Sequence, residues 1–437
     1  MTTDYLIEPG GRLLGCIRVP GDKSISHRAV MLGALADGVT HIEGLLQGED
    51  VLATLAAFRA MGVDIVEPQP GRLTIRGVGL DGLRPPGHPL DMGNSGTAMR
   101  LMSGILAAQS FDSELVGDSS LHKRPMRRVV EPLNAMGACI TMADGGRPPL
   151  SIKGGQRLQG TDYVMPVASA QVKSALLLAG LYADGVTSVA EPAPTRDHTE
   201  RMLKGFGYDL STADHTVRVQ GGGRLKGCDI QIPSDLSSAA FFLVGAAIAP
   251  ESTLKLEGVG VNPTRSGVLT LLQRMGADIE LRHRREIGGE AIADIHMSHS
   301  RLRGITIPED EVSLAIDEFP ILFVAAACAD GDTRLGGGGE LRAKESDRIA
   351  VMAKGLQQLG ITVQERADGV TIRGGQMSGG VVDTHGDHRV AMAFAMAGLR
   401  ADGPLTIRDC ENVNTSFPGF VAAAAAAGLG IQAVNGA

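Results

Sequence analysis

Charged and hydroxyl side chains gather where helices are expected to begin. Residues 18–28, RVPGDKSISHR, place two arginines, a lysine, a histidine and two serines where an apolar strand pattern gives way to a helical one. The free backbone N–H groups of a helix start attract anions. Lys23 can supply a point charge there, and Arg28 can hold a carboxylate or phosphate with two parallel hydrogen bonds. Simple capping of the helix by Asp22 or Ser24 is the alternative explanation.

Further junctions of this kind follow in the first half of the chain. The stretch DMGNSGTAMR, 91–100, offers small side chains and accessible N–H groups at a helix start, which suits close approach by an anion. The stretches SLHKRPMRR, VASAQVKSA and PTRDHTE add cations, hydroxyls and an amide. Each stretch taken alone also fits an ordinary helix cap or a solvated face. The candidate binding residues are Asn94, Gly96, Arg124, Ser169, Gln171 and Arg196.

The second half of the chain brings carboxylates to the same kind of junction. In AIDEFPILFVAAA, Asp317 and Glu318 directly precede a very apolar helix. Partial desolvation there raises the pKa of a carboxyl group and suits it to proton abstraction, although pairing with the helix dipole is an alternative role. In ELRAKESDR, Lys344 and Arg348 are expected one helical turn apart, which is favourable with an anion between them.

The stretch THGDHRVAM places His388 and Arg389 before another apolar helix. His385, Asp387 and His388 offer metal-ligating atoms, but no third matched ligand completes a site, so hydrogen bonding is the favoured role. We therefore predict no metal.

Composition limits the class of protein. The 437 residues carry a net charge of −8 and no long basic run, which argues against a nucleic-acid partner. The five cysteines form no C-x-x-C pair, which argues against a disulfide framework or zinc site and fits a reducing cytoplasm. The first residues lack a signal-peptide pattern, and the apolar runs are too short to span a bilayer. We expect a globular cytoplasmic protein without a membrane partner.

One sequence pattern recurs six times, as in FRAMGVDI and LQRMGADI. It consists of the expected end of a helix, a glycine, and then the alternating polar and apolar residues of a strand. The six central glycines, spaced by 75, 70, 69, 84 and 70 residues, are Gly62, Gly137, Gly207, Gly276, Gly360 and Gly430. A strand pattern such as GVTHIEGLL precedes each helix. The pattern predicts an α/β protein of six repeated units, each with a glycine after its helix.

Six such units exceed one hydrophobic core, so we expect three in each of two domains. One domain is predicted to span 21–235, and the other 1–20 together with 236–437. The N-terminal strand pair is expected to complete the sheet of the last unit. Chain crossings near Pro20 and Ser234 would form a hinge beside a cleft. Since Asp317 and Glu345 fall in the domain opposite Lys23 and Arg124, catalysis is expected to require closure.

The motifs PGDKSISHR, GNSGTAMR, KRPM, AKESDR and GDHRVAM, in this order along essentially the whole chain, resemble the signature stretches of the 5-enolpyruvylshikimate-3-phosphate synthase family. The resemblance implies a two-domain inverse α/β barrel of six βαβαββ repeats, three per domain. It implies that phosphoenolpyruvate and shikimate 3-phosphate react to give 5-enolpyruvylshikimate 3-phosphate and phosphate. It also implies that no metal or organic cofactor is used. We expect a monomer.

The resemblance implies a role for each matching residue. Asp317 would take the proton from the shikimate 5-hydroxyl, and Glu345, with Lys23, would protonate the methylene carbon. The implied contacts of shikimate 3-phosphate are Lys23, Ser24, Arg28, Ser169, Gln171, Arg196, Asp317 and Lys344. The implied contacts of phosphoenolpyruvate are Lys23, Asn94, Gly96, Arg124, Gln171, Arg348, His388 and Arg389.

Two positions depart from many family members: Thr415 replaces a lysine, and Ala170 replaces a serine. Gly96 leaves room for the inhibitor glyphosate, so we expect sensitivity to it. Two alternatives remain. An enolpyruvyl transferase acting on UDP-N-acetylglucosamine typically uses a loop cysteine, which the SLHKRPM loop lacks. A sixfold-repeat DNA clamp would need a positive inner face, whereas the basic residues here lie beside carboxylates.

Overall fold

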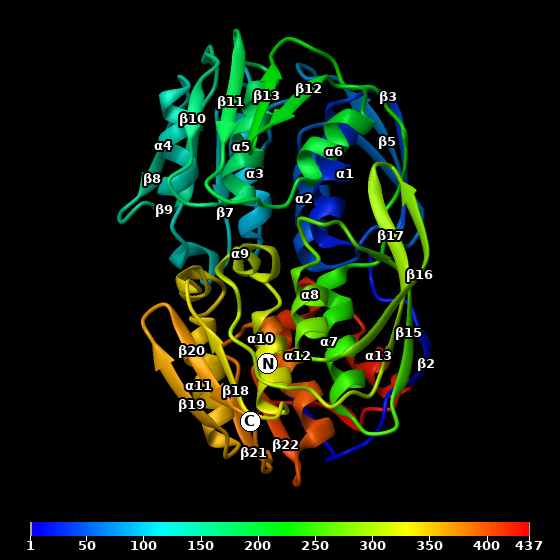
Figure 1. Ribbon diagram of the computed structural model, residues 1–437. Helices are drawn as coiled ribbons and strands as arrows, with labels where there is room; N and C mark the ends of the chain where they lie inside the picture. The colour runs from blue at the N-terminus through cyan, green and yellow to red at the C-terminus, as the bar shows by residue number, and fades with distance from the viewer. Residues whose placement is uncertain (1, 437) are drawn as a thin grey trace. The chain divides into compact units, whose positions relative to one another are not determined.

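The computed structural model describes residues 2–436, which fold into two compact units (Figure 1). The first, the 21–232 unit, contains Gly21–Ile232 together with the short segment Ile287–Glu290. The second, the 233–437 unit, contains Met1–Pro20, Pro233–Glu286 and Ala291–Ala437. The expected boundary at 235 lies three residues beyond the break after Ile232. The segment Ile287–Glu290, expected in the other domain, goes with the 21–232 unit.

The 21–232 unit contains three α/β repeats, each built on a four-stranded sheet. The first comprises β14 (Asp229–Gln231), α1 (Lys23–Leu35), β3 (Asp37–Glu43), α2 (Glu49–Ala60), β4 (Asp64–Gln69) and β5 (Arg72–Val78). The second comprises β6 (Leu90–Asp91), α3 (Gly96–Leu106), β7 (Ser113–Val116), η1 (Leu121–Lys123), α4 (Arg127–Ala135), β8 (Cys139–Ala143) and β9 (Arg147–Lys153). The third comprises β10 (Asp162–Val164), α5 (Ala170–Gly180), β11 (Val186–Ala190), α6 (His198–Gly205), β12 (Leu210–Ala213) and β13 (Thr216–Gln220). In the second repeat, for example, the strand order is β6-β7-β9-β8.

The 233–437 unit follows the same plan, except that the sheet of its fifth repeat has three strands. The fourth repeat comprises β2 (Leu14–Ile17), α7 (Leu236–Ile248), β15 (Thr253–Gly260), α8 (Gly267–Arg274), β16 (Asp278–Ile287) and β17 (Glu290–Ser298). The fifth comprises α9 (Glu309–Val312), η2 (Ser313–Ala315), α10 (Phe319–Ala327), β18 (Asp332–Leu335), η3 (Gly339–Ala343), α11 (Arg348–Gln358), β19 (Thr362–Arg366) and β20 (Gly369–Arg373). The sixth comprises β21 (Gly380–Asp383), α12 (His388–Ala397), η4 (Gly398–Arg400), β22 (Leu405–Arg408), η5 (Glu411–Thr415), α13 (Phe420–Ala427), β23 (Ile431–Asn435) and β1 (Thr3–Ile7).

The two N-terminal strands, β1 and β2, join different sheets. As expected, β1 joins the sixth repeat, antiparallel to β22 and β23. Contrary to expectation, β2 pairs in parallel with β15 of the fourth repeat. The first repeat likewise takes its parallel strand, β14, from the far end of its own unit. Each unit begins with a helix, so its first sheet needs a strand from another part of the chain.

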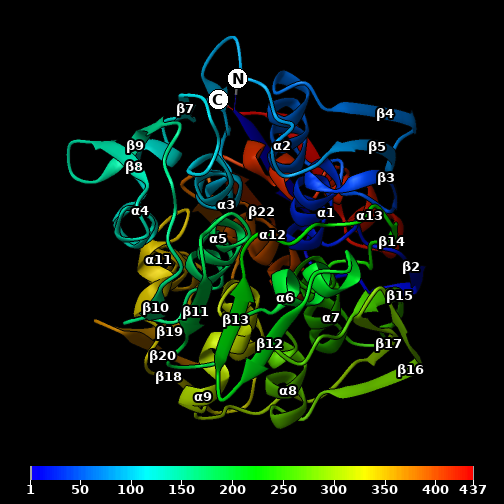
Figure 2. The ribbon, with the colours of Figure 1, turned by 90° about the horizontal axis from the view of Figure 1, so that it is seen from above.

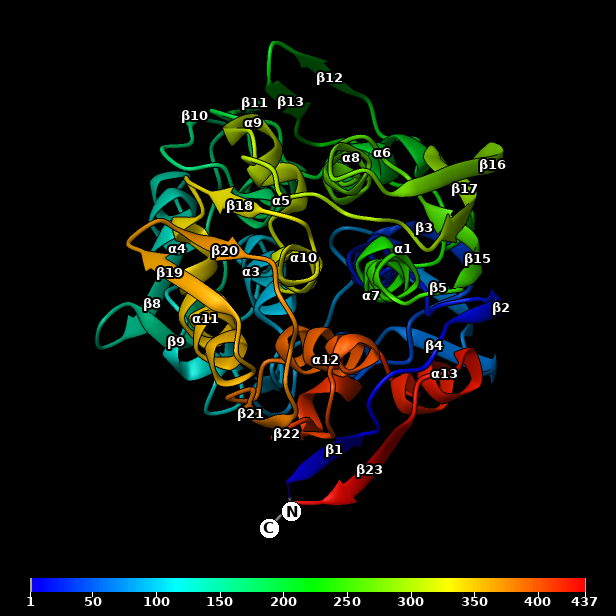
Figure 3. The same ribbon diagram turned by 60° about the horizontal axis from the view of Figure 1, so that its bottom comes forward.

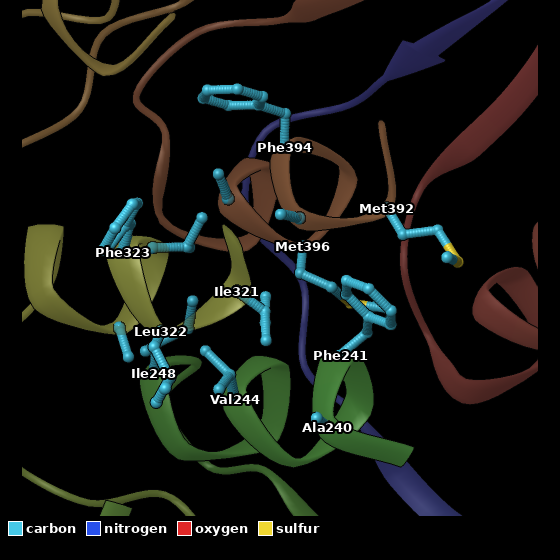
Figure 4. Close-up of a cluster of buried hydrophobic side chains, with 14 of the residues drawn as sticks. Ala240, Phe241, Val244, Ile248, Ile321, Leu322, Phe323, Met392, Phe394 and Met396 are labelled. Carbon is cyan, nitrogen blue, oxygen red and sulfur yellow. The ribbon is translucent and has the colours of Figure 1, made fainter. Parts of the chain in front are cut away.

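In each unit, helices on the inside are buried on all sides. Helices α1, α3 and α5 form the interior of the 21–232 unit, and the sheets of its repeats are seen around them in Figure 2. Helices α7, α10 and α12 form the interior of the 233–437 unit (Figure 3). Their sequences, such as FPILFVAAA in α10, are apolar around the whole helix, as burial on every side requires. Phe241, Ile321 and Met396 come from these three helices and meet in one cluster (Figure 4).

Five of the six repeat glycines end their helices as predicted. Gly62, Gly137, Gly207, Gly276 and Gly360 all have positive φ, between 76° and 103°, which favours glycine. In the sixth repeat the prediction is wrong. Helix α13 ends at Ala427, and Gly428, with φ of 117°, follows it instead of Gly430. A Cβ at Gly428 would lie 2.2 Å from the Arg12 carbonyl oxygen, so close packing adds a second reason for glycine.

No helix described for residues 2–436 is long and apolar enough to cross a membrane.

Candidate active site

The residues predicted to bind substrates lie at strand-to-helix junctions, as the sequence indicated. Helix α1 begins at Lys23, and Asp22 caps it by accepting a hydrogen bond from the Ile25 N–H at 2.9 Å. Helix α3 begins at Gly96 after the capping residue Ser95, and Ser169 caps α5. The capping explanation therefore holds at these junctions, and it is compatible with binding because capping leaves other N–H groups of the first turn available.

Lys23 has an acidic partner. Its ammonium group forms an ion pair with the carboxylate of Asp50, whose side chain is 5% exposed, in the first turn of α2. Sequence reasoning missed Asp50. The signal was present, since GLLQGED is the strand-to-helix junction of the same repeat and carries charge just as the other junctions do.

Arg28 is buried, and its hydrogen bonds go to neutral oxygens. Its Nε donates to Thr199 Oγ1 at 2.6 Å, Nη1 to the Ser24 carbonyl oxygen at 2.9 Å, and Nη2 to Ser174 Oγ at 2.7 Å. Burial lowers the pKa of Arg28 to about 10, although the nearby carboxylates of Glu200 and Asp22 oppose this effect. The charge of Arg196 lowers the pKa further. A buried guanidinium with neutral partners attracts an anionic ligand.

Carboxylates near Arg28 are engaged by another cation. Buried Lys173 of α5 forms ion pairs with Glu191 at 3.1 Å and Glu200 at 2.7 Å. Glu200 directly follows Thr199, the hydroxyl partner of Arg28. Hydroxyl groups therefore contact Arg28, while the nearby carboxylates of Glu191 and Glu200 contact Lys173.

A second group of polar residues surrounds Gly96. Asn94 accepts a hydrogen bond from Arg124 Nη2 at 2.7 Å and donates one to Asp118 at 2.7 Å. A Cβ at Gly96 would lie 2.8 Å from Arg100 Nη1 and 3.1 Å from Arg124 Nη1. The position is therefore in contact with two guanidinium groups, and any added side chain would push them aside.

Gln171 connects α5 to this group. Its Oε1 accepts from Arg100 Nη1 at 2.7 Å, and its Nε2 donates to Thr97 Oγ1 at 2.9 Å. Arg100, to which the sequence analysis gave no role, thus links Gln171 to Gly96. Arg196 is half-buried two residues before α6, and Ser24 and Ser169 are likewise half-buried.

In the 233–437 unit the predicted residues converge on Arg348, whose side chain is 1% exposed. Its Nη1 lies 3.4 Å from Asp317 Oδ1, its Nη2 2.5 Å from Glu345 Oε2, and its Nε 2.9 Å from Asp387 Oδ2. The proposed base and the proposed acid are therefore held by two nitrogens of one guanidinium.

Lys344 joins the same group, but not by the expected geometry. It follows the short helix η3 in extended conformation, and Arg348 begins α11, so the two cations do not lie one turn apart on a helix. Each nevertheless contacts Asp317 Oδ1, Lys344 at 3.2 Å and Arg348 at 3.4 Å. The anion expected between them is the Asp317 carboxylate.

Arg389 lies on the other side of Asp317. Its Nη1 donates to the Asp317 carbonyl oxygen at 3.1 Å and is 3.7 Å from Glu318 Oε1. Glu318 is 1% exposed and accepts a hydrogen bond from Ser237. His388 is buried as the first residue of α12. Thr415, where the family resemblance led us to expect a lysine, is also buried, and its hydroxyl donates to the Asn412 carbonyl oxygen at 2.7 Å.

Comparison with known proteins identifies the family. Residues 7–423 match the family model described as EPSP synthase (3-phosphoshikimate 1-carboxyvinyltransferase). A protein of that name from Alkalilimnicola ehrlichii is 62% identical over 429 residues, covering 98% of this chain and 96% of its own. Another from Methylococcus capsulatus is 62% identical over 424 residues, covering 97% of each chain. The chain belongs to the EPSP synthase family.

Solved structures agree with this assignment. The EPSP synthase of Acinetobacter baumannii has 55% sequence identity and a TM-score of 0.89, with 100% of both chains covered. The two-domain α/β fold implied by the sequence resemblance is thereby confirmed. Membership of the EPSP synthase family leaves no support for the DNA-clamp alternative.

Within 2–436, no group of three or more His, Cys, Asp or Glu side chains is placed to hold a metal ion. In this EPSP synthase family member, the absence of a cofactor and sensitivity to glyphosate stay predictions.

Proposed function

We propose that the polar groups of both units act on one pair of substrates, with cations and hydroxyls from the 21–232 unit and carboxylates and arginines from the 233–437 unit. As a member of its family, the chain transfers the enolpyruvyl group of phosphoenolpyruvate to the 5-hydroxyl of shikimate 3-phosphate and releases phosphate. The assignment of individual residues to this reaction is the proposal.

Shikimate 3-phosphate is proposed to bind through the buried cation Arg28 together with hydroxyl and amide groups. The remaining proposed contacts are Lys23, Ser24, Ser169, Gln171, Arg196, Asp317 and Lys344. The hydrogen bonds of Arg28 support this role, because within residues 2–436 its side chain donates to two hydroxyls and a carbonyl oxygen and to no carboxylate.

Phosphoenolpyruvate is proposed to bind through arginines that can hold its carboxylate and phosphate. These contacts are Lys23, Asn94, Gly96, Arg124, Gln171, Arg348, His388 and Arg389. The position of Gly96 against the guanidinium groups of Arg100 and Arg124 supports the assignment, since the missing side chain leaves these cations accessible from that side.

The contact of Asp317 and Glu345 with one guanidinium is the observation that carries the proposed mechanism. Asp317 takes the proton of the 5-hydroxyl while that oxygen bonds to C2 of phosphoenolpyruvate. Glu345, with Lys23, delivers a proton to the C3 methylene carbon. Transfer of a proton from C3 back to Glu345 then re-forms the double bond as the C2–O bond breaks, and phosphate leaves with the electron pair of that bond. Arg348 keeps the two carboxylates in place, so little reorganisation is needed during proton transfer.

The deciding experiment measures phosphate release from phosphoenolpyruvate in the presence of shikimate 3-phosphate. We expect Asp317→Ala to lower kcat by about 10²–10⁴-fold, the usual contribution of a general base. Asp310→Ala, which removes an exposed carboxylate of the same unit, is the matched control and should keep wild-type activity.

A parallel reaction with UDP-N-acetylglucosamine tests the alternative substrate. Phosphate release that depends on the nucleotide sugar would overturn the acceptor assignment but retain enolpyruvyl transfer. Wild-type activity in the Asp317→Ala variant would exclude Asp317 as the base.

We further propose that the chain acts as a monomer in the cytoplasm, without nucleic-acid or membrane partners. The cysteines are free thiols, which suits a reducing compartment. The net charge of −8 disfavours association with nucleic acid or an anionic lipid surface. Sedimentation of the purified chain at micromolar concentration tests the monomer.

A further inference from the structure

His27 is a fully buried histidine on α1 to which the proposed mechanism assigns no role. Its ring lies between Thr54 of α2, with Nδ1 2.8 Å from Thr54 Oγ1, and Ser95, the capping residue of α3, with Nε2 3.4 Å from Ser95 Oγ. One imidazole thus connects three helices. The first turns of these helices carry Lys23, its partner Asp50, and Gly96.

The hydroxyl groups around His27 determine its tautomer. Ser95 Oγ accepts the Ala98 N–H at 3.1 Å, and its own proton can go to His27 Nε2. Thr54 Oγ1 donates to the Asp50 carbonyl oxygen at 3.5 Å, so it can accept the Nδ1 proton of His27. Of the two neutral tautomers, only the one with its proton on Nδ1 satisfies all four contacts, since the single proton of Thr54 goes to the Asp50 carbonyl oxygen.

The surrounding charges favour the same neutral form. Burial lowers the pKa of His27 well below its ordinary value, and the cations Lys23 and Arg28 lower it further, while Asp22 opposes them. A ring nitrogen that cannot easily be protonated keeps accepting the Ser95 hydroxyl proton across the neutral pH range.

We propose that His27 is a positioning residue for enolpyruvyl transfer: its neutral imidazole fixes the Asn94–Gly96 turn relative to Lys23. This inference rests on the proposed function, in which that turn binds phosphoenolpyruvate. The chain of contacts runs from Ser95 through His27 to Thr54 and the first turn of α2, where Asp50 holds Lys23. His27 touches neither substrate in this account and acts through the turn.

The test replaces His27 with leucine, which fills the space but makes no hydrogen bond. With the turn no longer fixed, we expect His27→Leu to raise the KM for phosphoenolpyruvate about tenfold, the effect of losing one or two neutral hydrogen bonds. The KM for shikimate 3-phosphate and kcat should change less than about threefold by the same reasoning. His27→Asn, which keeps an amide donor and acceptor, should recover part of the loss.

A matched control separates positioning from general destabilisation. Ile140→Val removes one buried methylene-sized group from β8 of the neighbouring repeat and should leave both KM values unchanged. Nitrogen-15 NMR of the imidazole provides an independent measurement, with a proton expected on Nδ1 and none on Nε2 between pH 6 and 8.

The outcomes are distinct. If the wild type is active and His27→Leu keeps the wild-type KM for phosphoenolpyruvate, the positioning role is overturned. The proposed function would still stand in that case. Equal changes in both KM values and kcat, or an Nε2-protonated or cationic ring, would overturn it as well. A wild-type chain that releases no phosphate with both substrates would overturn the proposed function and, with it, this inference.

Discussion

Arg28 and Arg348 are both buried arginines at strand-to-helix junctions, yet their surroundings are opposite. Arg28 donates its hydrogen bonds to two hydroxyls and a carbonyl, and burial lowers its pKa to about 10. Burial would also lower the pKa of Arg348. The carboxylates of Asp387, Glu345 and Asp317 outweigh that effect and raise the pKa above its ordinary value. The same side chain is thus hydrogen-bonded to carboxylates in one unit and to neutral oxygens in the other.

The difference indicates two uses of a buried cation. Arg348 is part of a compensated network, where its removal would take a buried guanidinium away from three carboxylates. Arg28 bears the energetic cost of burial without a carboxylate hydrogen bond, which a binding site repays when an anionic ligand arrives. Identical substitutions at the two positions therefore test the comparison directly.

The largest effect is expected for Arg348→Met. Asp387 is fully buried beside it, and Glu345 and Asp317 are largely buried, so losing the guanidinium should destabilise the fold by about 3–5 kcal/mol. The midpoint of denaturant unfolding measures the loss. A second change, Asp387→Asn, removes one of the uncompensated charges and should restore part of the stability. A stable single variant would mean that the three carboxylates do not depend on Arg348.

Arg28→Met should have the opposite effects: stability should change little, and the binding of shikimate 3-phosphate should weaken. Thr199 donates to Ser174 at 2.7 Å, and Ser174 to the Ala170 carbonyl oxygen at 2.6 Å, so these hydroxyls keep partners after the arginine is removed. Stability should stay within about 1 kcal/mol of the wild type. The KM for shikimate 3-phosphate should rise about 100-fold, as expected for loss of a buried charged contact.

Thermal unfolding and steady-state kinetics on the same Arg28→Met sample provide both measurements. Thr199→Val, which removes one hydroxyl partner but keeps the charge, is the control and should have the smaller effect on KM. A large loss of stability with unchanged KM would show that Arg28 is a structural residue, and the contrast with Arg348 would fail.

The sequence supported much of the fold because each repeat carries local signals. The alternating pattern of GVTHIEGLL predicted β3, and the glycine after FRAM predicted the end of α2 near Gly62. The pairing of β2 with β15 was missed because register between distant strands depends on the whole fold, and both repeats offered a suitable edge. The last helix was placed two residues too far because Gly428 and Gly430 both fit the local pattern.

Site residues were predictable by type but not by partner. Lys23, Arg28 and Asp317 were visible because charge at a helix start is a local feature of sequence. Their partners Asp50, Thr199 and Arg348 lie between 27 and 171 positions away, so only the folded chain brings them together. His27 was inside the first quoted motif but received no role, since its burial between two other helices has no local signature.

The smallest effect is expected for the pH dependence of stability through His27, which probes the positive surroundings of Arg28 and Lys23. The folded chain holds the pKa of His27 well below 6.5, whereas the unfolded chain takes up a proton near that pH. Below pH 6.5 the unfolded state therefore binds more protons, and stability falls as the pH falls. The contribution at pH 5.5 is about 1.4 kcal/mol, the value of one pH unit.

His27→Asn removes the titrating group and should lower the loss of unfolding free energy between pH 8 and 5.5 by about 1.4 kcal/mol. His41→Asn, at an exposed histidine of β3, controls for the loss of a histidine as such and should leave most of the slope. If His27→Asn keeps the wild-type slope, His27 takes up its proton in the folded state as easily as in the unfolded chain. Burial and the positive charges of Lys23 and Arg28 would then have no net effect on the pKa of His27, and the contrast between the two buried arginines would lose this support.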